Sequence, residues 1–148
     1  MFITLKRFSS IEELAPVFEH GGQVTFVPIM VYPGICIVRG KDHPWEIILR
    51  VLATKGLSDQ KETLLHEFVH LFHNSGDGYS INPRETRIFN ETEVNRQTKR
   101  LLKHNPKIVD EITKELILRP NCSIMFPSDE DVNPFREYYQ SLVNEIVK

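Results

Sequence analysis

The sequence predicts an α+β fold, in which a small antiparallel sheet is followed by a helical half. Two observations predict it. Short segments with β-type patterning, bounded by glycine and proline, fill the chain as far as Val51. After Leu57 apolar residues recur at helical spacing, and helix-capping signals appear. Strands first and helices afterwards are typical of α+β domains.

A single domain is expected for residues 1–148. This length is sufficient for one hydrophobic core. The sequence contains no internal repeat, low-complexity tract or linker long enough to separate two domains.

The N-terminal part begins with a predicted short strand, Phe2–Phe8. Ser10 and Glu13 have the spacing of a capping box, which predicts a short helix that stops at Gly21 and Gly22. Three further strands are predicted from β-type runs separated by turn residues: Gln23–Val31, Gly34–Val38 and Trp45–Val51.

Four longer helices are predicted after these strands. Ser58 or Asp59 caps the first of them, which runs to Phe72. The other three are Asn90–Lys103, Ile108–Leu118 and a C-terminal helix that starts at Asn133-Pro134.

Composition excludes several classes of function. The net charge is −2, which argues against a nucleic-acid binder that works by neutralising phosphates. No apolar stretch approaches the length of a membrane span, and Met1–Phe8 is too short and too polar for a secretory signal. Cys36 and Cys122 form no ligand pair or disulfide framework, so reduced thiols in a cytoplasmic protein are expected.

The segment Leu64–His70 contains the sequence His-Glu-x-x-His, which is the spacing of zinc peptidases. His66 and His70 are four residues apart, so on a helix both imidazoles lie on one face and offer nitrogen ligands to one metal ion. Glu67 lies beside that face, where it can take a proton from an activated water. A chain of this composition contains the three fixed residues by chance in roughly 2% of shuffles, so further evidence is needed.

A helical wheel separates the histidines from the expected core. The apolar side chains of this helix form one arc, and His66, His70 and His73 form another beside it. The alternative is that these histidines are structural, at the surface or hydrogen-bonded in the core. His73 lies about 10 Å along the axis from His66, at ~1.5 Å per residue, so we expect it to support the ligands or lie at the surface.

A catalytic zinc site normally has three protein ligands, and the third is expected from the next helix. On its wheel Glu91 shares the apolar face with Val94 and Asn95, whereas Glu93 lies opposite, where pairing with Arg96 explains it. A carboxylate on a buried face needs a partner, and zinc would supply one. Glu91 is therefore the predicted third ligand; the alternative is an interfacial carboxylate paired with an arginine or a helix end.

These motifs resemble the ImmA/IrrE family of zinc metallopeptidases, which is similar to a minimal gluzincin. The resemblance rests on His66–His70, on Glu91–Asn95 and on the Leu101-Leu102 pair, and it extends from Gly34 to Leu102. The family pattern places the third metal ligand on the first glutamate of the second motif, which is Glu91 here.

Five positions differ from the family pattern, and two of them are Lys103 and His104, which follow Leu101-Leu102 where the family has Met-Pro. Val69 precedes the second histidine, where the family often has a small residue. Gln97 and Thr98 replace a Phe-Ala pair. The ligands and the base are intact, so these differences bear on the substrate groove and on specificity.

The resemblance implies a zinc-dependent endopeptidase in the cytoplasm, with one Zn²⁺ per chain, that cleaves a repressor-type protein. His66, His70 and Glu91 would hold the zinc, and Glu67 would be the general base. No nucleic-acid or membrane partner is expected. An edge strand is expected to align the substrate by β-augmentation, and Trp45–Val51 is the predicted strand. Two alternatives stay open: a zinc-stabilised interaction domain without peptidase activity, and a metal-free fold.

Overall fold

The computed structural model describes residues 7–28, 34–38, 42–50, 56–74, 83–126 and 133–147, with side chains for all of these except residues 74 and 83–90. The predicted strand Phe2–Phe8 lies mostly outside the described residues. Its last two residues, Arg7 and Phe8, are not in a strand.

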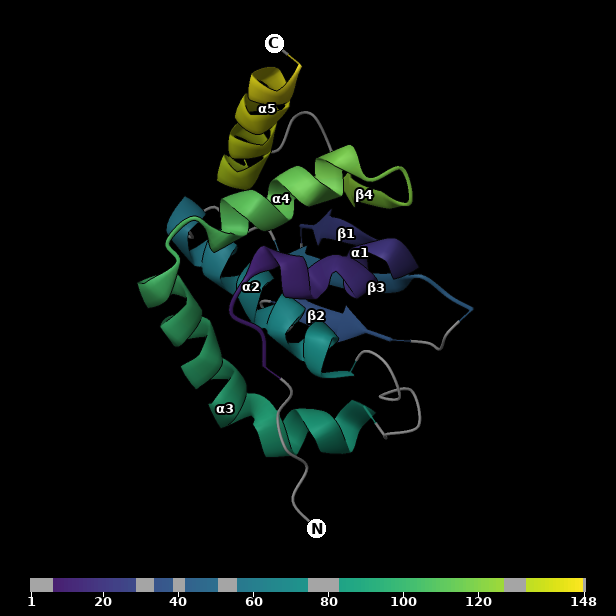
Figure 1. The fold of residues 1–148 in the computed structure, drawn as a ribbon, viewed down its shortest axis with the longest axis vertical. Coiled ribbons are helices and arrows are strands. Elements are labelled where there is room, and N and C mark those ends of the chain that lie inside the picture. Colours follow the sequence, from purple (N-terminus) through teal and green to yellow (C-terminus); the bar gives the residue numbers. More distant parts are fainter. Residues whose placement is uncertain are drawn as a thin grey trace.

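The α+β prediction is confirmed (Figure 1). Glu13 accepts a hydrogen bond of 3.0 Å from the backbone N–H of Ser10, as the capping box predicts. None of the helices in the described part of the chain is long and apolar enough to cross a membrane. The elements in chain order are the 3-10 helix η1 (Ile11–Leu14), α1 (Ala15–His20), β1 (Gly22–Val27), β2 (Gly34–Ile37), β3 (Trp45–Arg50), α2 (Leu57–Asn74), α3 (Pro83–His104), α4 (Ile108–Leu118), β4 (Cys122–Met125) and α5 (Pro134–Ile146).

The four-stranded sheet is mixed, with the order β2-β3-β1-β4. Antiparallel pairing, which was expected throughout, is found only between β2 and β3. β1 is parallel to β3 on one side and to β4 on the other. This order corrects the expectation that the Trp45–Val51 strand lies at an edge, because β3 has a neighbour on each side. Among the described strands, β2 and β4 form the two edges.

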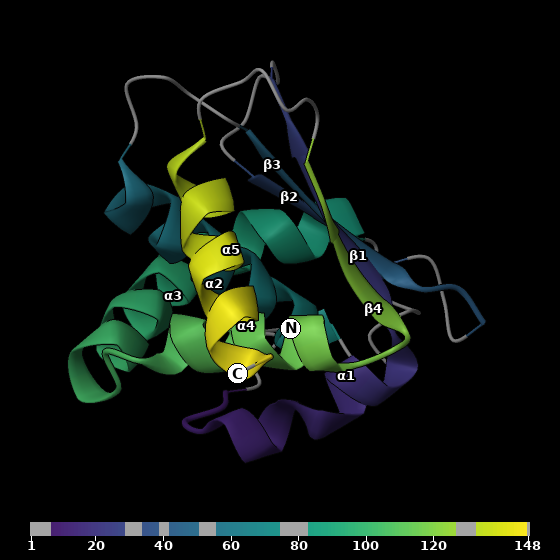
Figure 2. The same ribbon diagram turned by 90° about the horizontal axis from the view of Figure 1, so that it is seen from above.

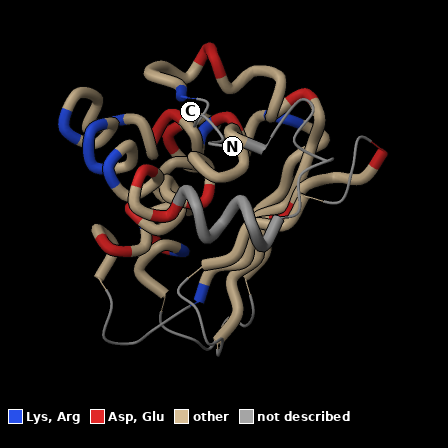
Figure 3. The backbone as a smooth tube through the Cα atoms, turned by 90° about the horizontal axis from the view of Figure 1, so that it is seen from below, with Lys and Arg blue, Asp and Glu red and all other residues tan. Residues whose placement is uncertain are grey.

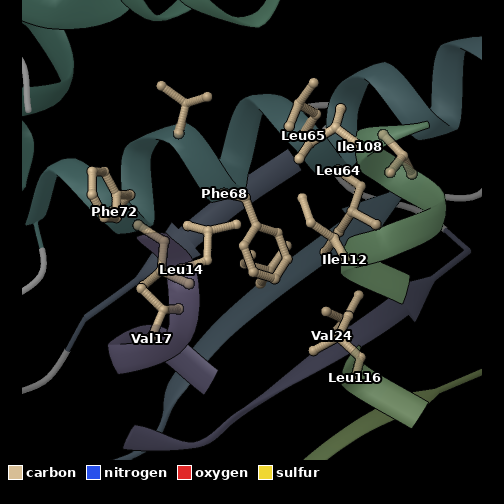
Figure 4. Close-up of a cluster of buried hydrophobic side chains, with 14 of the residues drawn as sticks. Leu14, Val17, Val24, Leu64, Leu65, Phe68, Phe72, Ile108, Ile112 and Leu116 are labelled. Carbon is tan, nitrogen blue, oxygen red and sulfur yellow. The ribbon is translucent and has the colours of Figure 1, made fainter. Parts of the chain in front are cut away.

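One face of the sheet is buried beneath helices α2 and α4. Along β1 and β3 every second residue is buried, and the residues between them are partly exposed. Phe68 of α2 points into this layer, where its ring lies 5.5 Å from the ring of Trp45 and 5.9 Å from that of Phe18. Figure 4 shows the same layer from the side, with Leu64, Phe68 and Phe72 of α2 above the strands. The contacts fix α2, which carries the His-Glu-x-x-His motif, firmly on the sheet.

The C-terminal helix α5 is attached to α2 and α4 by polar contacts (Figure 2). Asn133 caps α5 by accepting from the backbone N–H of Phe135, and Gln60 of α2 donates to the same Asn133 oxygen. The hydroxyl of Tyr138 donates to Asp110 of α4. Burial, together with this bond to Asp110, raises the pKa of Tyr138 above its usual range.

Gly22 allows the close approach of β1 to Trp45. A Cβ at Gly22 would lie 2.0 Å from Cδ2 of the Trp45 ring, which is buried and donates from Nε1 to the carbonyl of Val17 at 2.9 Å. Gly22→Ala is therefore expected to lower the free energy of unfolding by about 3 kcal/mol, because a fixed ring must move. Urea titration followed by the fluorescence of the single tryptophan measures this effect. Gly56→Ala is the control, since a Cβ there meets nothing within 4 Å; equal losses in both variants would contradict the prediction.

Candidate metal centre

Helix α2 places His66 and His70 one turn apart, with ring centroids separated by 4.9 Å. The His70 side chain is 7% exposed and that of His66 is 15% exposed. The regular i, i+4 spacing on a helix anchored to the sheet therefore orients both imidazoles in the same direction. That direction is toward α3, which packs along α2.

Helix α3 contributes Glu91 to the two histidines. Its Oε1 lies 2.7 Å from Nε2 of His66, and its Oε2 lies 3.1 Å from Nε2 of His70. One ligand atom from each of the three residues lies within 4.8 Å of the other two. The structure thus brings together the three side chains that the sequence singled out as metal ligands. They form a group that is close enough to bind a metal ion.

The donor set fits zinc in chemistry and spacing. Two imidazole nitrogens and one carboxylate are the ligands of many catalytic zinc sites. With zinc–ligand bonds of ~2.0–2.2 Å, ligand atoms around a tetrahedral ion are roughly 3.3 Å apart. The nitrogen–oxygen distances of 2.7 Å and 3.1 Å are hydrogen bonds to the two different oxygens of Glu91 and are shorter than this value, so the side chains would have to move apart by roughly 0.2–0.6 Å to admit the ion.

The electrostatics of the group favour an ionised carboxylate. Hydrogen bonds from His66, and then from His70, hold the pKa of Glu91 well below its usual range, although partial burial acts in the opposite direction. The Glu91 side chain is 43% exposed, so it combines a contact to α2 with access to solvent. An ionised, partly exposed carboxylate is the form in which glutamate binds a metal.

Glu93 makes the ordinary surface contacts that were expected for it. It accepts from Arg96 at 2.6 Å, one turn along the helix, and from Arg7 at 3.4 Å. The choice of Glu91 over Glu93 as the ligand therefore agrees with the positions of both side chains.

The buried face of α3 differs from the predicted one. Asn95 was expected on the apolar face but is exposed, whereas Gln97, which falls on the Glu93 side of the helical wheel, is only 6% exposed. The Gln97 side chain donates to the backbone carbonyl of Phe8 at 2.9 Å. The segment at Phe8 therefore packs on α3. As a result, the buried face of α3 includes Gln97, and Glu91 lies at the border of that face. Three of the departures from the family pattern, Val69, Gln97 and Thr98, are buried residues of helix packing, whereas Lys103 and His104 are exposed.

His73 is not one of the grouped ligand residues, as its position along the helix axis predicted. We expected His73 either to support the ligands or to lie at the surface. The surface position is wrong, because His73 is only 6% exposed. Neighbouring elements cover α2 on this side. The histidine arc of the helical wheel therefore does not face solvent.

Glu67 is 4% exposed and lies against β2. A Cβ at Gly34 would be 3.0 Å from Oε2 of Glu67 and 3.0 Å from Cγ2 of Thr63. A larger residue at this position of the edge strand would therefore push the Glu67 and Thr63 side chains aside by a few tenths of an ångström. Sequence reasoning did not assign Gly34 a role, although a glycine within a strand pattern is a signal of close backbone approach.

A scan against protein-family models, a search of curated proteins and a search of solved structures each found no match to this chain. The evidence on function is therefore the geometry of His66, His70 and Glu91.

Proposed function

We propose that this chain is a zinc-dependent metalloendopeptidase of the ImmA/IrrE type, which hydrolyses a peptide bond in a cytoplasmic, repressor-type protein. The observation that carries the proposal is the convergence of His66 and His70 from α2 with Glu91 from α3. Convergence of three ligand residues from two helices goes beyond the chance occurrence of a short motif. The resemblance of the motifs to the family adds the substrate class.

Zinc held by these three side chains would activate a water molecule and polarise the scissile carbonyl. Glu67 is the proposed base, which accepts the proton of that water and passes it to the leaving amine. It follows His66 directly in the sequence, and its side chain is buried beside Gly34, which limits the space in which its carboxylate can move. A carboxylate held in one position is suited to repeated proton transfer.

The edge strand β2 is the proposed guide for the substrate backbone. It lies next to α2, and Gly34 at its start contacts Glu67. Among the described residues no strand pairs with its outer edge. An extended peptide added to β2 would place its backbone beside the proposed base. This role replaces the one expected for Trp45–Val51, because β3 is an interior strand.

One observation favours the alternative, a zinc-stabilised interaction domain without peptidase activity. Glu67 is 4% exposed, and a base must reach a water molecule. In this alternative the metal would join α2 to α3 and stabilise the fold, while partner binding would occur elsewhere.

The metal requirement is tested first, by zinc analysis of native protein purified without chelator and of protein reconstituted with zinc. We expect about one zinc per chain, as a His2Glu site predicts. Protein that carries almost no zinc and takes up none on reconstitution would exclude both zinc proposals and leave the metal-free fold.

Peptidase and interaction domain are then separated with Glu67→Gln, which keeps the ligands. Zinc-loaded variants are incubated with the repressor-type proteins encoded nearest to its gene, and fragments are measured by mass spectrometry. Cleavage is expected to be at least ~100-fold slower in Glu67→Gln than in the wild type, whereas zinc content is unchanged. Glu62→Gln, the same change on the same helix, should cleave normally. A wild type that keeps its zinc and binds such a partner without cutting it favours the interaction domain.

A further inference from the structure

The C-terminal part of α3 carries a row of exposed cations. We refer to these residues as the α3 basic surface. Each is exposed, and Arg96 is 59% exposed at its side chain. In Figure 3, blue bands that mark Lys and Arg follow one another along the described part of α3. The residues are Arg96, Lys99, Arg100, Lys103 and Lys107.

Helical spacing places these cations together on one side. Successive members are three, one, three and four residues apart, so the first four project from a single exposed arc of the helix. The sequence has no aspartate or glutamate between Glu93 and Asp110. The arc therefore lacks the i, i+4 acidic partners that normally balance a solvated helix face.

The ion pairs of the described residues leave most of this charge unbalanced. Arg96 pairs with Glu93 at 2.6 Å. Within the described part of the chain, no ion pair joins a carboxylate to Lys99, Arg100, Lys103 or Lys107. By contrast, Lys114 on α4 and Arg119, the residue directly after it, each pair with a glutamate. Four neighbouring unbalanced cations on a chain with a net charge of −2 form a local field that attracts anions.

We propose that the α3 basic surface binds an acidic segment of the protein substrate; this inference rests on the proposed peptidase function. The surface is on the helix that supplies Glu91 to the metal centre. Arg96 follows Glu91 by about 7.5 Å along the axis and Lys103 by about 18 Å, at ~1.5 Å per residue. At ~100° per residue the cations of α3 project about 80–180° away from Glu91 around the helix, so the acidic segment must pass around a helix ~10–12 Å wide. At ~3.3 Å per residue of extended chain, the segment still lies within roughly ten residues of the scissile bond.

A protein segment fits this surface better than a nucleic acid does. The basic row is short, covering about two turns of helix and the turn after it, at 3.6 residues per turn. A duplex carries one charge per ~1.7 Å and would extend beyond the row onto a chain with a sequence pI near 6.3. A compact cluster of glutamates and aspartates matches the number and the extent of the cations.

The test measures binding and does not depend on cleavage. Zinc-loaded protein is titrated into a fluorescein-labelled peptide of about twelve residues in which glutamate alternates with glycine, a length that covers the row with ease. The peptide with lysine in place of glutamate and a short DNA duplex are the comparison probes. The variant is the triple replacement Lys99→Gln, Arg100→Gln and Lys103→Gln. The matched control is Lys114→Gln, Arg119→Gln and Arg136→Gln, which removes the same charge from α4 and α5.

The glutamate peptide is expected to bind the wild type, with an affinity that falls as salt is raised. The α3 variant should bind it roughly tenfold more weakly, while the control variant stays within about twofold and both keep their zinc. Equal weakening in the two variants, or no binding of the glutamate peptide, would overturn the proposal. Tighter binding of the duplex through the same three residues would assign the surface to nucleic acid. The titration measures binding, whereas the Glu67→Gln experiment measures cleavage. The peptidase proposal and the acidic-segment proposal can therefore fail independently of each other.

Discussion

Glu91→Ala is expected to weaken zinc binding by more than about a hundredfold, since even the loss of a residue that only supports a ligand costs 10–100-fold. Glu91 is the carboxylate that contacts both histidines, at 2.7 Å and 3.1 Å. Removing it leaves two imidazoles on one helix, which is too few protein ligands for a catalytic zinc site. Competition against a chromophoric zinc chelator measures the affinity.

Glu93→Ala is the matched control for this prediction, because the residue lies two positions away on the same helix. Its carboxylate contacts Arg96 and Arg7 at the surface, and such exposed pairs contribute about 0–1 kcal/mol to stability. Zinc affinity in Glu93→Ala should therefore equal that of the wild type. Circular dichroism checks that both variants keep their helices. Equal losses of affinity in the two variants would refute Glu91 as a ligand.

The candidate site could be predicted because most of its geometry is local. His66 and His70 are fixed relative to each other by the helix alone, at ring centroids 4.9 Å apart. Glu91 was separated from Glu93 by helical periodicity, since the two residues point about 160° apart at ~100° per residue. The bounds of α4, Ile108–Leu118, are as predicted, whereas α3 begins at Pro83, seven residues before the predicted start at Asn90.

The remaining features depend on tertiary contacts, which the hydrophobic periodicity of the sequence does not indicate. Gln97 is buried because the segment at Phe8 packs on α3, far away in the sequence. The place of Trp45–Arg50 inside the sheet depends on β1, which pairs with it in parallel. β4 has four residues and follows directly after the turn at Pro120-Asn121, so it has too few residues for an alternating pattern to appear.

The position of Glu67 beside Gly34 also depends on tertiary structure. A substitution at Gly34 is the second change from which we expect a large effect. We expect Gly34→Ala to lower the rate of peptide cleavage by roughly tenfold, because the added Cβ displaces Glu67 by a few tenths of an ångström and a misplacement of about 1 Å costs about 100-fold. An added Cβ would lie 3.0 Å from Oε2 of Glu67, 3.1 Å from its Cγ and 3.0 Å from Cγ2 of Thr63. These distances are shorter than the ~3.5–4.0 Å of optimal contact, so the carboxylate must move.

Stability and zinc binding separate this effect from simple misfolding. The atoms displaced by the Cβ belong to side chains and not to backbone, so the free energy of unfolding should fall by only about 1 kcal/mol. Zinc affinity should not change, because none of the ligand side chains is among the nearest atoms that the Cβ meets. Gly56→Ala serves again as the control, with wild-type cleavage expected. A Gly34→Ala variant that cleaves at the wild-type rate would show that Glu67 need not be held against β2. Parallel loss of zinc and activity would instead locate the effect in the metal centre.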